Sequence, residues 1–312
     1  MARHFIFDLY RLNVVDSDDL FLENADFRLR SDDDITQVLT EACTAAFDQT
    51  QETRTAVFKW SLREFTPYND ALSDRKICSV LLARSIMSKD GLIVTDDGIG
   101  AGTSSSSPPL AAAMMVLFDL SRHLVAIEHS GELGQTAWKD FIEKILGETA
   151  LSLGRSSLIE LEPVPERHGI IGLFRSFDRI TRFKVTLRIP NPELTRYTRE
   201  LYNDLIKSGV REYTQDMKNP NGLSKDENAR PFASAALAEQ GYKKGEVNLE
   251  GIRNDSFEKV SSGSTAARGS IKALKSFVRG MHANARAKET QKALLAIVEE
   301  IDKLHPKENQ NA

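Results

Sequence analysis

Residues 180–189 read Ile-Thr-Arg-Phe-Lys-Val-Thr-Leu-Arg-Ile and alternate strictly between polar and apolar side chains from Arg182 onward. A period of two is the signature of a β-strand, because successive side chains point to opposite faces of a sheet. The apolar face predicts contact with a core, and the face with Arg182, Lys184 and Arg188 predicts contact with solvent. A sheet with one solvent-exposed face is typically antiparallel. Pro190-Asn191-Pro192 predicts the end of the strand.

The segments on both sides of this strand extend the pattern. Acidic residues 32–34 before a periodic apolar run predict a helix start, since carboxylates are favoured there. Lys89-Asp90-Gly91 predicts a hairpin turn, and the Gly, Ser and Pro residues of 97–109 predict a loop. The expected strands are 4–15, 55–65, 76–87, 92–94, 112–119, 123–128, 157–162, 180–189 and 243–250. The expected helices are 33–48, 135–147, one that contains Leu194, Tyr197, Leu201 and Leu205, then 226–239 and 266–304. This order predicts an α+β fold of mostly antiparallel sheets with packed helices and a long C-terminal helix.

The length of 312 residues and the hydrophobic fraction of 41% suffice for a sizeable core. We expect an N-terminal α+β region at 1–150, a second α+β region at 151–262 and a basic C-terminal helix at 263–312. The two cysteines, Cys43 and Cys78, form no C-x-x-C pair and are expected to be reduced and buried. No apolar run approaches the roughly 20 residues of a membrane span, so we expect a cytoplasmic protein without membrane insertion.

Sequence motifs for catalysis are missing from the chain. The glycines at 98, 100 and 102 do not form a phosphate loop, because no lysine follows them and Pro108-Pro109 blocks the helix such a loop needs. A metal-dependent nuclease or another hydrolase stays an alternative function, and its candidate acidic residues are Asp119, Glu128, Glu160 and Glu162. Ser130 stands where a nuclease hairpin would carry a lysine. We therefore predict no catalytic residue, no metal site and no cofactor.

Cations gather near the C-terminus. Between residues 259 and 288 the chain has seven Lys or Arg residues and no Asp or Glu. The whole chain carries −4 and this segment +7, so the remainder carries −11. If 266–304 is a helix, spacings of three and four place one row on one face, namely Arg268, Lys272, Lys275, Arg279, His282 and Arg286. Such a row fits a phosphate backbone, although a solvated basic face has the same pattern.

Three stretches resemble the RexA family of phage exclusion proteins: Met115-Val116-Leu117-Phe118 to Leu146 with its Asp140-Phe141-Ile142, then Leu158 to Pro163, and Ala238-Glu239-Gln240-Gly241-Tyr242. The resemblance implies a bacterial or prophage-encoded defence protein that binds DNA without strong sequence preference. It also implies self-association and action with the product of a neighbouring gene. It supplies no catalytic residues.

These observations predict a non-enzymatic, sequence-nonspecific DNA-binding protein of anti-phage defence that forms a homodimer. The residues expected to bind phosphates are Arg268, Lys272, Lys275, Arg279, Arg286, Arg182, Lys184 and Arg188. Two alternatives stay open. One is the nuclease or hydrolase, and the other is a scaffold protein that pairs through its C-terminal helix.

Overall fold

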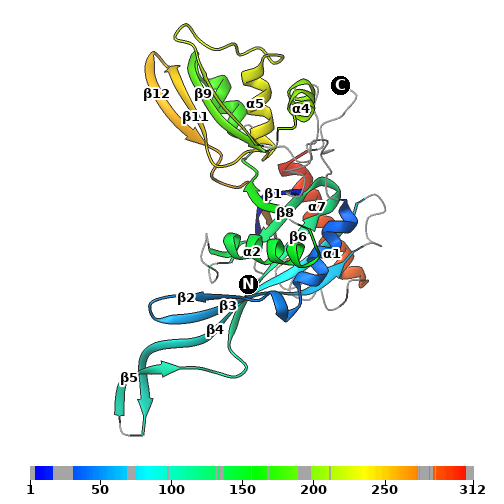
Figure 1. The fold of residues 1–312 in the computed structure, drawn as a ribbon, viewed down its shortest axis with the longest axis vertical. Coiled ribbons are helices and arrows are strands. Elements are labelled where there is room, and N and C mark those ends of the chain that lie inside the picture. Colours follow the sequence, from blue (N-terminus) through cyan, green and yellow to red (C-terminus); the bar gives the residue numbers. More distant parts are fainter. Residues whose placement is uncertain are drawn as a thin grey trace.

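In the computed structural model the described residues are 4–16, 31–68, 75–96, 98–130, 133, 137–155, 157–166, 169–188, 198–210, 212–272, 274, 281, 284 and 286–306. They form an α+β fold of two antiparallel sheets with helices packed on them and a helix near the C-terminus, which confirms the expected fold class (Figure 1). No helix in these ranges is long and apolar enough to cross a membrane.

The larger sheet has nine strands in the order β13-β1-β7-β6-β4-β3-β2, with β5 on β4 and β8 on β1. Its strands are β1 (Phe5–Asp16), β2 (Gln49–Glu52), β3 (Ala56–Pro67), β4 (Ile77–Thr95), β5 (Gly98–Ser104), β6 (Ala111–Asp119), β7 (Leu124–Glu128), β8 (Ser157–Pro163) and β13 (Arg268–Ile271). Both ends of the chain therefore contribute strands to one sheet.

Helices cover both faces of the larger sheet. On β1, Leu12 and Val14 face a core shared with α1 (Asp32–Ala42) and α2 (Ala137–Ser152), whereas Phe7 and Leu9 face a core shared with α7 (Lys288–Leu304). This division follows from the two-residue period of the strand. At the start of α1, the Ser31 side chain and Asp34 cap each other, which fixes the helix where its acidic residues predict it.

The smaller sheet has the order β10-β9-β11-β12. Its strands are β9 (Arg179–Arg188), β10 (Glu212–Lys218), β11 (Val247–Arg253) and β12 (Ser256–Ser262), and its helices are α3 (Gly169–Ser176), α4 (Arg199–Lys207) and α5 (Arg230–Glu239). Phe183, Val185 and Leu187 of β9 are fully buried against these helices, as their alternation predicts. The opposite face of the sheet is polar and open. The second region expected at 151–262 thus loses β8 to the larger sheet and otherwise forms the smaller one.

The turn expected at residues 89–91 is absent, and this prediction was wrong. Strand β4 continues through these residues to Thr95, and β5 occupies part of the stretch expected to be a loop. The chain reverses direction between Asp96 and Gly98 instead, and Gly98 has a φ of 141° that suits glycine. In the resulting register, Leu92 lies opposite Ala101 and Val94 lies opposite Ile99.

The two thiols are free in the structure. Cys78 is buried on β4, and Cys43 is half-buried at the end of α1, where its Sγ lies 3.3 Å from the carbonyl oxygen of Leu39. Burial raises the pKa of the Cys43 thiol to about 11 and raises that of Cys78 as well. Both side chains are therefore protonated at neutral pH and poor nucleophiles.

A fully buried arginine joins the two sheets. Arg11 of β1 donates from Nε to the carbonyl oxygen of Gln240 at 2.9 Å and from Nη1 to that of Arg122 at 2.6 Å. Its guanidinium lies 4.5 Å from the centre of the Tyr242 ring. Since Gln240 and Tyr242 follow α5, this one side chain connects the larger sheet to the smaller sheet.

Candidate nucleic-acid interface

The expected helix over 266–304 does not include residues 268–271, which form a strand, and helix α7 begins at Lys288. The prediction of one basic helix face that includes Arg268 was therefore wrong. Residues 268–271 form β13 and pair with Phe5 to Asp8 of β1. Strand pairing at this position buries Ala267 and Gly269 against the sheet, and glycine weakens a helix interior. Spacings of three and four among the cations fit a helix, but they do not require one. Lys275, Arg279 and His282 lie outside the described residues.

Arg268 forms an ion pair with Asp8 of β1. Its Nε donates to Oδ1 of Asp8 at 2.7 Å, and Asp8 Oδ2 also lies 3.1 Å from Nδ1 of His129. The hydrogen bond to Asp8 raises the pKa of the Arg268 guanidinium. A phosphate would have to compete with this carboxylate, so Arg268 contributes less positive potential than its position in the sequence indicates.

Three exposed cations near the ends of the β13–α7 connection are better placed. Lys272 follows β13 directly, Lys288 is the first residue of α7, and Lys292 lies one turn later on the same helix face. None of the three forms an ion pair with any residue that the structure describes. Arg286 is also exposed and lies two residues before α7. Within the described part of 259–288, Lys272 and Lys288 are therefore exposed cations without an ion pair, although they do not lie on one helix face.

Lys288 and Lys292 were absent from the predicted phosphate-binding residues. Their spacing of four is visible in the sequence and would have identified them once the helix start was known. The N-cap of α7 is Ala287, which has no side-chain oxygen to accept a first-turn N–H. Lysines are unfavourable at a helix N-terminus because the macrodipole is positive there. An anion bound at this end would offset that cost.

The predicted cations of β9 lie together on the open face of the smaller sheet, but two of them are paired with acids. Arg182 donates to Asp216 from Nε at 2.7 Å and to Glu250 from Nη1 at 3.0 Å. Arg188 pairs with Glu160 and donates from Nε to Glu212 at 2.7 Å. These contacts raise the pKa of Arg182 and lower that of Asp216.

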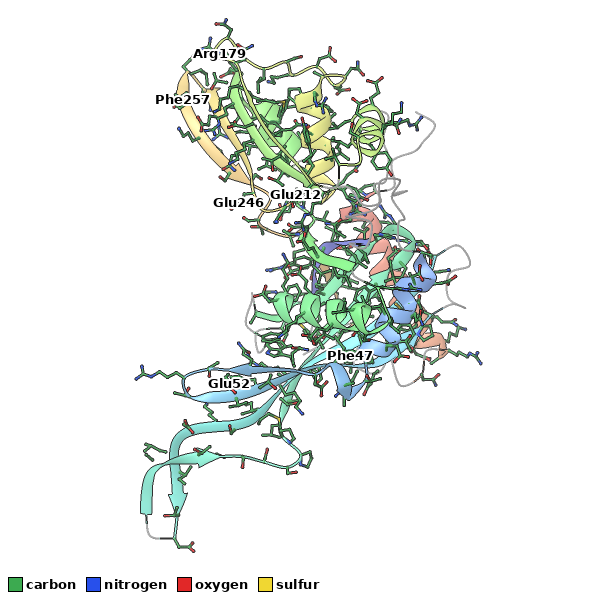
Figure 2. The ribbon with its side chains drawn as sticks, viewed as in Figure 1. Phe47, Glu52, Arg179, Glu212, Glu246 and Phe257 are labelled. Atoms are coloured by element: carbon green, nitrogen blue, oxygen red, sulfur yellow. The ribbon has the colours of Figure 1, made fainter. Side chains whose placement is uncertain are left out.

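Lys184 is the predicted cation of β9 without an ion pair among the described residues. It is exposed, and its register neighbours are Asp216 on β10 and Asn248 on β11. Figure 2 shows Glu212 and Glu246 at the end of the smaller sheet near the larger one, and Arg179 and Phe257 at the far end. This face is a mixed surface of both signs rather than a basic patch.

The acidic residues of the hydrolase alternative are not brought together. Asp119 is fully buried against Arg75, whereas Glu128 lies at the other end of the β6–β7 hairpin and accepts a hydrogen bond from the Met115 amide. Glu160 and Glu162 share a face of β8 on the far side of β1. No group of three or more His, Cys, Asp or Glu side chains within the described ranges is arranged to hold a metal ion.

Glu162 belongs to a buried ion pair instead. Its Oε2 lies 3.6 Å from Nζ of Lys243, which also donates to the carbonyl oxygen of Gly245 at 2.9 Å. Burial raises the pKa of Glu162 and lowers that of Lys243, because both charges have lost water. Lys139 of α2 lies 3.8 Å from Oε1 of Glu162. The contacts of Glu162 thus connect the larger sheet, α2 and the segment between α5 and β11, which is a structural role.

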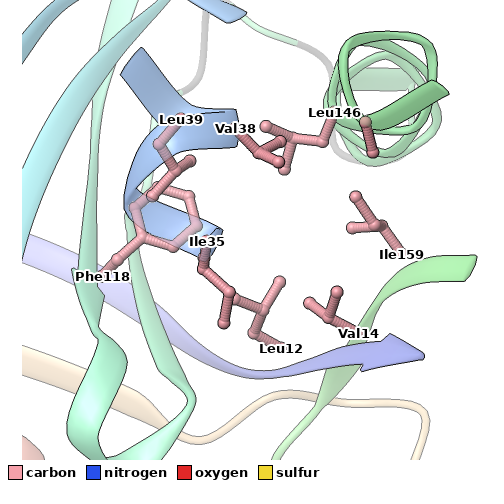
Figure 3. A pocket seen from close by; sticks show the side chains of 9 residues that line it. Leu12, Val14, Ile35, Val38, Leu39, Phe118, Leu146 and Ile159 are labelled. Carbon is pink, nitrogen blue, oxygen red and sulfur yellow. The ribbon is translucent and has the colours of Figure 1, made fainter. Parts of the chain in front are cut away.

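A small pocket lies between α1, α2 and the larger sheet (Figure 3). Nine apolar side chains line it: Leu12, Val14, Ile35, Val38, Leu39, Phe118, Leu146, Ala150 and Ile159. A ligand site usually adds a few polar groups that orient the ligand. This lining has none, so the pocket is best described as a gap in core packing.

One protein-family model matches the chain over residues 110–276, which is more than half of its length. The match begins next to β6, contains the whole smaller sheet and ends just after β13. It therefore covers the open face of that sheet and the first part of the cationic segment. No curated protein matches the chain. The chain belongs to the family described as a domain of unknown function, DUF4747.

Proposed function

We propose that the protein is a non-enzymatic factor that binds DNA through its phosphate backbone, without strong sequence preference, in the cytoplasm. The observation that carries the proposal is the run from 259 to 288, which has seven cations and no acids in a chain of net charge −4. Each phosphate that a cation neutralises releases counterions, so such a run favours nucleic acid. Because three stretches of the chain resemble the RexA family, we propose that this DNA binding serves anti-phage defence.

The phosphate-binding surface of this proposal consists of Lys272, Arg286, Lys288 and Lys292. These side chains are exposed on the two sides of the β13–α7 connection. The N-terminus of α7 adds its own positive dipole end at Lys288. Phosphate contacts carry no base information, which accounts for the absence of sequence preference in the proposal.

The framework beneath this surface is held firmly. Leu294, Ile297 and Ile301 of α7 are fully buried on the larger sheet. At the other end of the helix, Asp302 accepts from Arg75 Nη1 and Arg122 Nη1, each at 2.7 Å. The apolar face of α7 is consequently used inside the molecule, which disfavours the alternative of a scaffold that pairs through this helix.

The test is a fluorescence-anisotropy titration of two unrelated duplexes at several salt concentrations. The double variant Lys288→Glu with Lys292→Glu should weaken binding equally for both duplexes and reduce the salt slope by about 1.8, or about 0.9 per lost contact. The matched control is Lys144→Glu with Lys207→Glu, which makes the same total charge change on the exposed surfaces of α2 and α4. Failure of the parent to bind at low salt, or equal loss in both doubles, contradicts the proposal.

The defence role is tested separately by plaque counts in a bacterial host that expresses the protein together with its flanking genes. Expression of the parent chain should lower the plaque count, and the Lys288→Glu and Lys292→Glu double variant should restore it. If the double variant protected the host as fully as the parent chain does, the defence role would not depend on DNA binding through Lys288 and Lys292.

A further inference from the structure

The last part of β4 and all of β5 form a two-stranded arm that extends away from the body (Figure 1). Strand β3 accompanies β4 only as far as Lys89, and beyond that residue β4 pairs with β5 alone. We call residues 89–96 and 98–104 the distal hairpin. A two-stranded hairpin is marginally stable in water, and further strands or a packed face are normally needed to support it.

One face of the distal hairpin is apolar and exposed. Leu92 lies opposite Ala101 and Val94 lies opposite Ile99, so these four side chains share a face. Leu92, Val94 and Ile99 are 79%, 81% and 72% exposed. On the other face Ile93 lies against Gly102, where an added Cβ would come within 2.4 Å of Ile93 Cδ1. The exposed apolar side chains of the hairpin therefore lie on the face of Leu92, Val94 and Ile99, whereas the other face has Ile93 packed over glycine.

The outer edge of β5 has no strand partner among the described residues. Natural edge strands are usually protected from pairing with another chain by a charged side chain, a proline or a bulge. Residues 98–104 read Gly-Ile-Gly-Ala-Gly-Thr-Ser and contain neither a charge nor a proline, and the β4–β5 register is regular. An unprotected edge beside an apolar face is suited to strand addition.

We propose that β5 pairs antiparallel with β5 of a second copy of this chain, about a twofold axis at Ala101. In a symmetric antiparallel pair, a residue on the axis lies opposite itself. Only an axis at Ala101 uses the whole strand, with Gly98 opposite Ser104, Ile99 opposite Thr103 and Gly100 opposite Gly102. The resulting four-stranded sheet gathers the apolar side chains of both copies on one face.

The charges and the shape of the arm favour a protein partner over a lipid bilayer. Asp96 is exposed at the tip, and Lys89 and Asp90 are exposed at the base. Insertion would carry the carboxylate of Asp96 into hydrocarbon, which is costly. Antiparallel pairing places the tip of one arm beside the base of the other, so the two bodies lie at opposite ends of the paired arms. The apolar face then belongs to an interface between two copies.

The proposal is tested by sedimentation velocity of the full chain over a range of concentrations and without DNA, so its failure is distinct from that of the proposed function. The parent should form dimers. Ala101→Lys and Ala101→Glu each place like charges on the axis and should raise the dimer Kd about tenfold or more. An equimolar mixture of the two variants should form heterodimers, because opposite charges then meet. The control Ala111→Lys, on an exposed position of β6 outside the arm, should leave the Kd unchanged.

Three results would overturn the proposal. One is a parent that stays monomeric at every concentration. Another is a mixture of the two Ala101 variants that stays monomeric although each variant retains the circular dichroism spectrum of the parent. The third is a monomer that floats with phosphatidylglycerol-containing vesicles and loses this binding on Leu92→Lys, which would assign the apolar face to a membrane.

Discussion

Gly269 on β13 lies against the buried ring of Phe7 on β1, so closely that a Cβ at position 269 would come within 2.3 Å of Phe7 Cζ. The ring is fully buried and has little room to move. Gly269→Ala should therefore destabilise the protein by about 1–3 kcal/mol through overpacking. Urea unfolding measures the change. The control Ser270→Ala, on the exposed face of the same strand, should change stability by no more than about 0.5 kcal/mol. Equal effects of the two variants would argue against pairing of β13 with β1.

Arg75 holds the fully buried carboxylate of Asp119, to which its Nε donates at 3.0 Å. Burial raises the pKa of Asp119, and Arg75 opposes that shift. Arg75→Met should cost about 3–5 kcal/mol, because it leaves a buried charge without its partner. Adding Asp119→Asn should recover part of this loss. A double variant as unstable as the sum of the two single variants would show that they are not coupled.

Removing the acid that occupies Arg268 should strengthen DNA binding. Asp8→Asn frees the guanidinium of Arg268 for a phosphate, and the salt slope should increase by about 0.9 for the added contact. Asp216→Asn makes the same charge change on the open face of the smaller sheet, where it frees Arg182 in part. Anisotropy titrations compare the two. An equal gain in both variants would assign the effect to net charge rather than to the β13 side of the molecule.

The ion pairs of Arg182 predict a pH-dependent stability. Hydrogen bonds from Arg182 hold the pKa of Asp216 below its usual value, so this carboxylate stabilises the fold above its unfolded pKa of about 3.9. That contribution disappears as the pH falls through the lowered pKa. Arg182→Met should therefore be less stable than the parent at pH 7, and the gap should close in strong acid. Urea midpoints at several pH values measure this gap.

Lys184→Met is the matched control for the pH experiment, because Lys184 lies on the same strand and face and has no ion pair among the described residues. Its stability relative to the parent should vary little between pH 7 and strong acid. If the gap for Lys184→Met closes in acid as the gap for Arg182→Met does, the pH dependence does not come from the Arg182 ion pairs.

Strands with strict alternation and helices with clear start signals could be predicted from the sequence. The alternation of 180–189 corresponds to β9, and the aspartates at 32–34 correspond to the start of α1. These features are local, because a two-residue period or a capping side chain depends only on near neighbours. The β6–β7 hairpin was also predicted at the right place for the same reason.

The features that could not be predicted from the sequence depend on contacts between residues that are distant in the sequence. Residues 268–271 become a strand because β1, at the other end of the chain, offers an edge for pairing. The ion pairs of Arg182 could not be predicted either, because its partners Asp216 and Glu250 lie on other strands. Strand register and the charge that faces a given side chain are tertiary properties, and spacing along one segment does not contain them.

The return of β13 to β1 also sets an order for folding during synthesis. Residues 5–8 are made long before residues 268–271, their neighbour in the sheet, which follow the entire smaller lobe, residues 169–262. Domains generally form as units while the chain emerges, and distant pairings form slowly. The smaller lobe has all of its strands by Ser262. In the nascent chain, residues 5–8 of β1 therefore stay uncovered on one edge until β13 is made, and this is the period in which a chaperone would have most to bind.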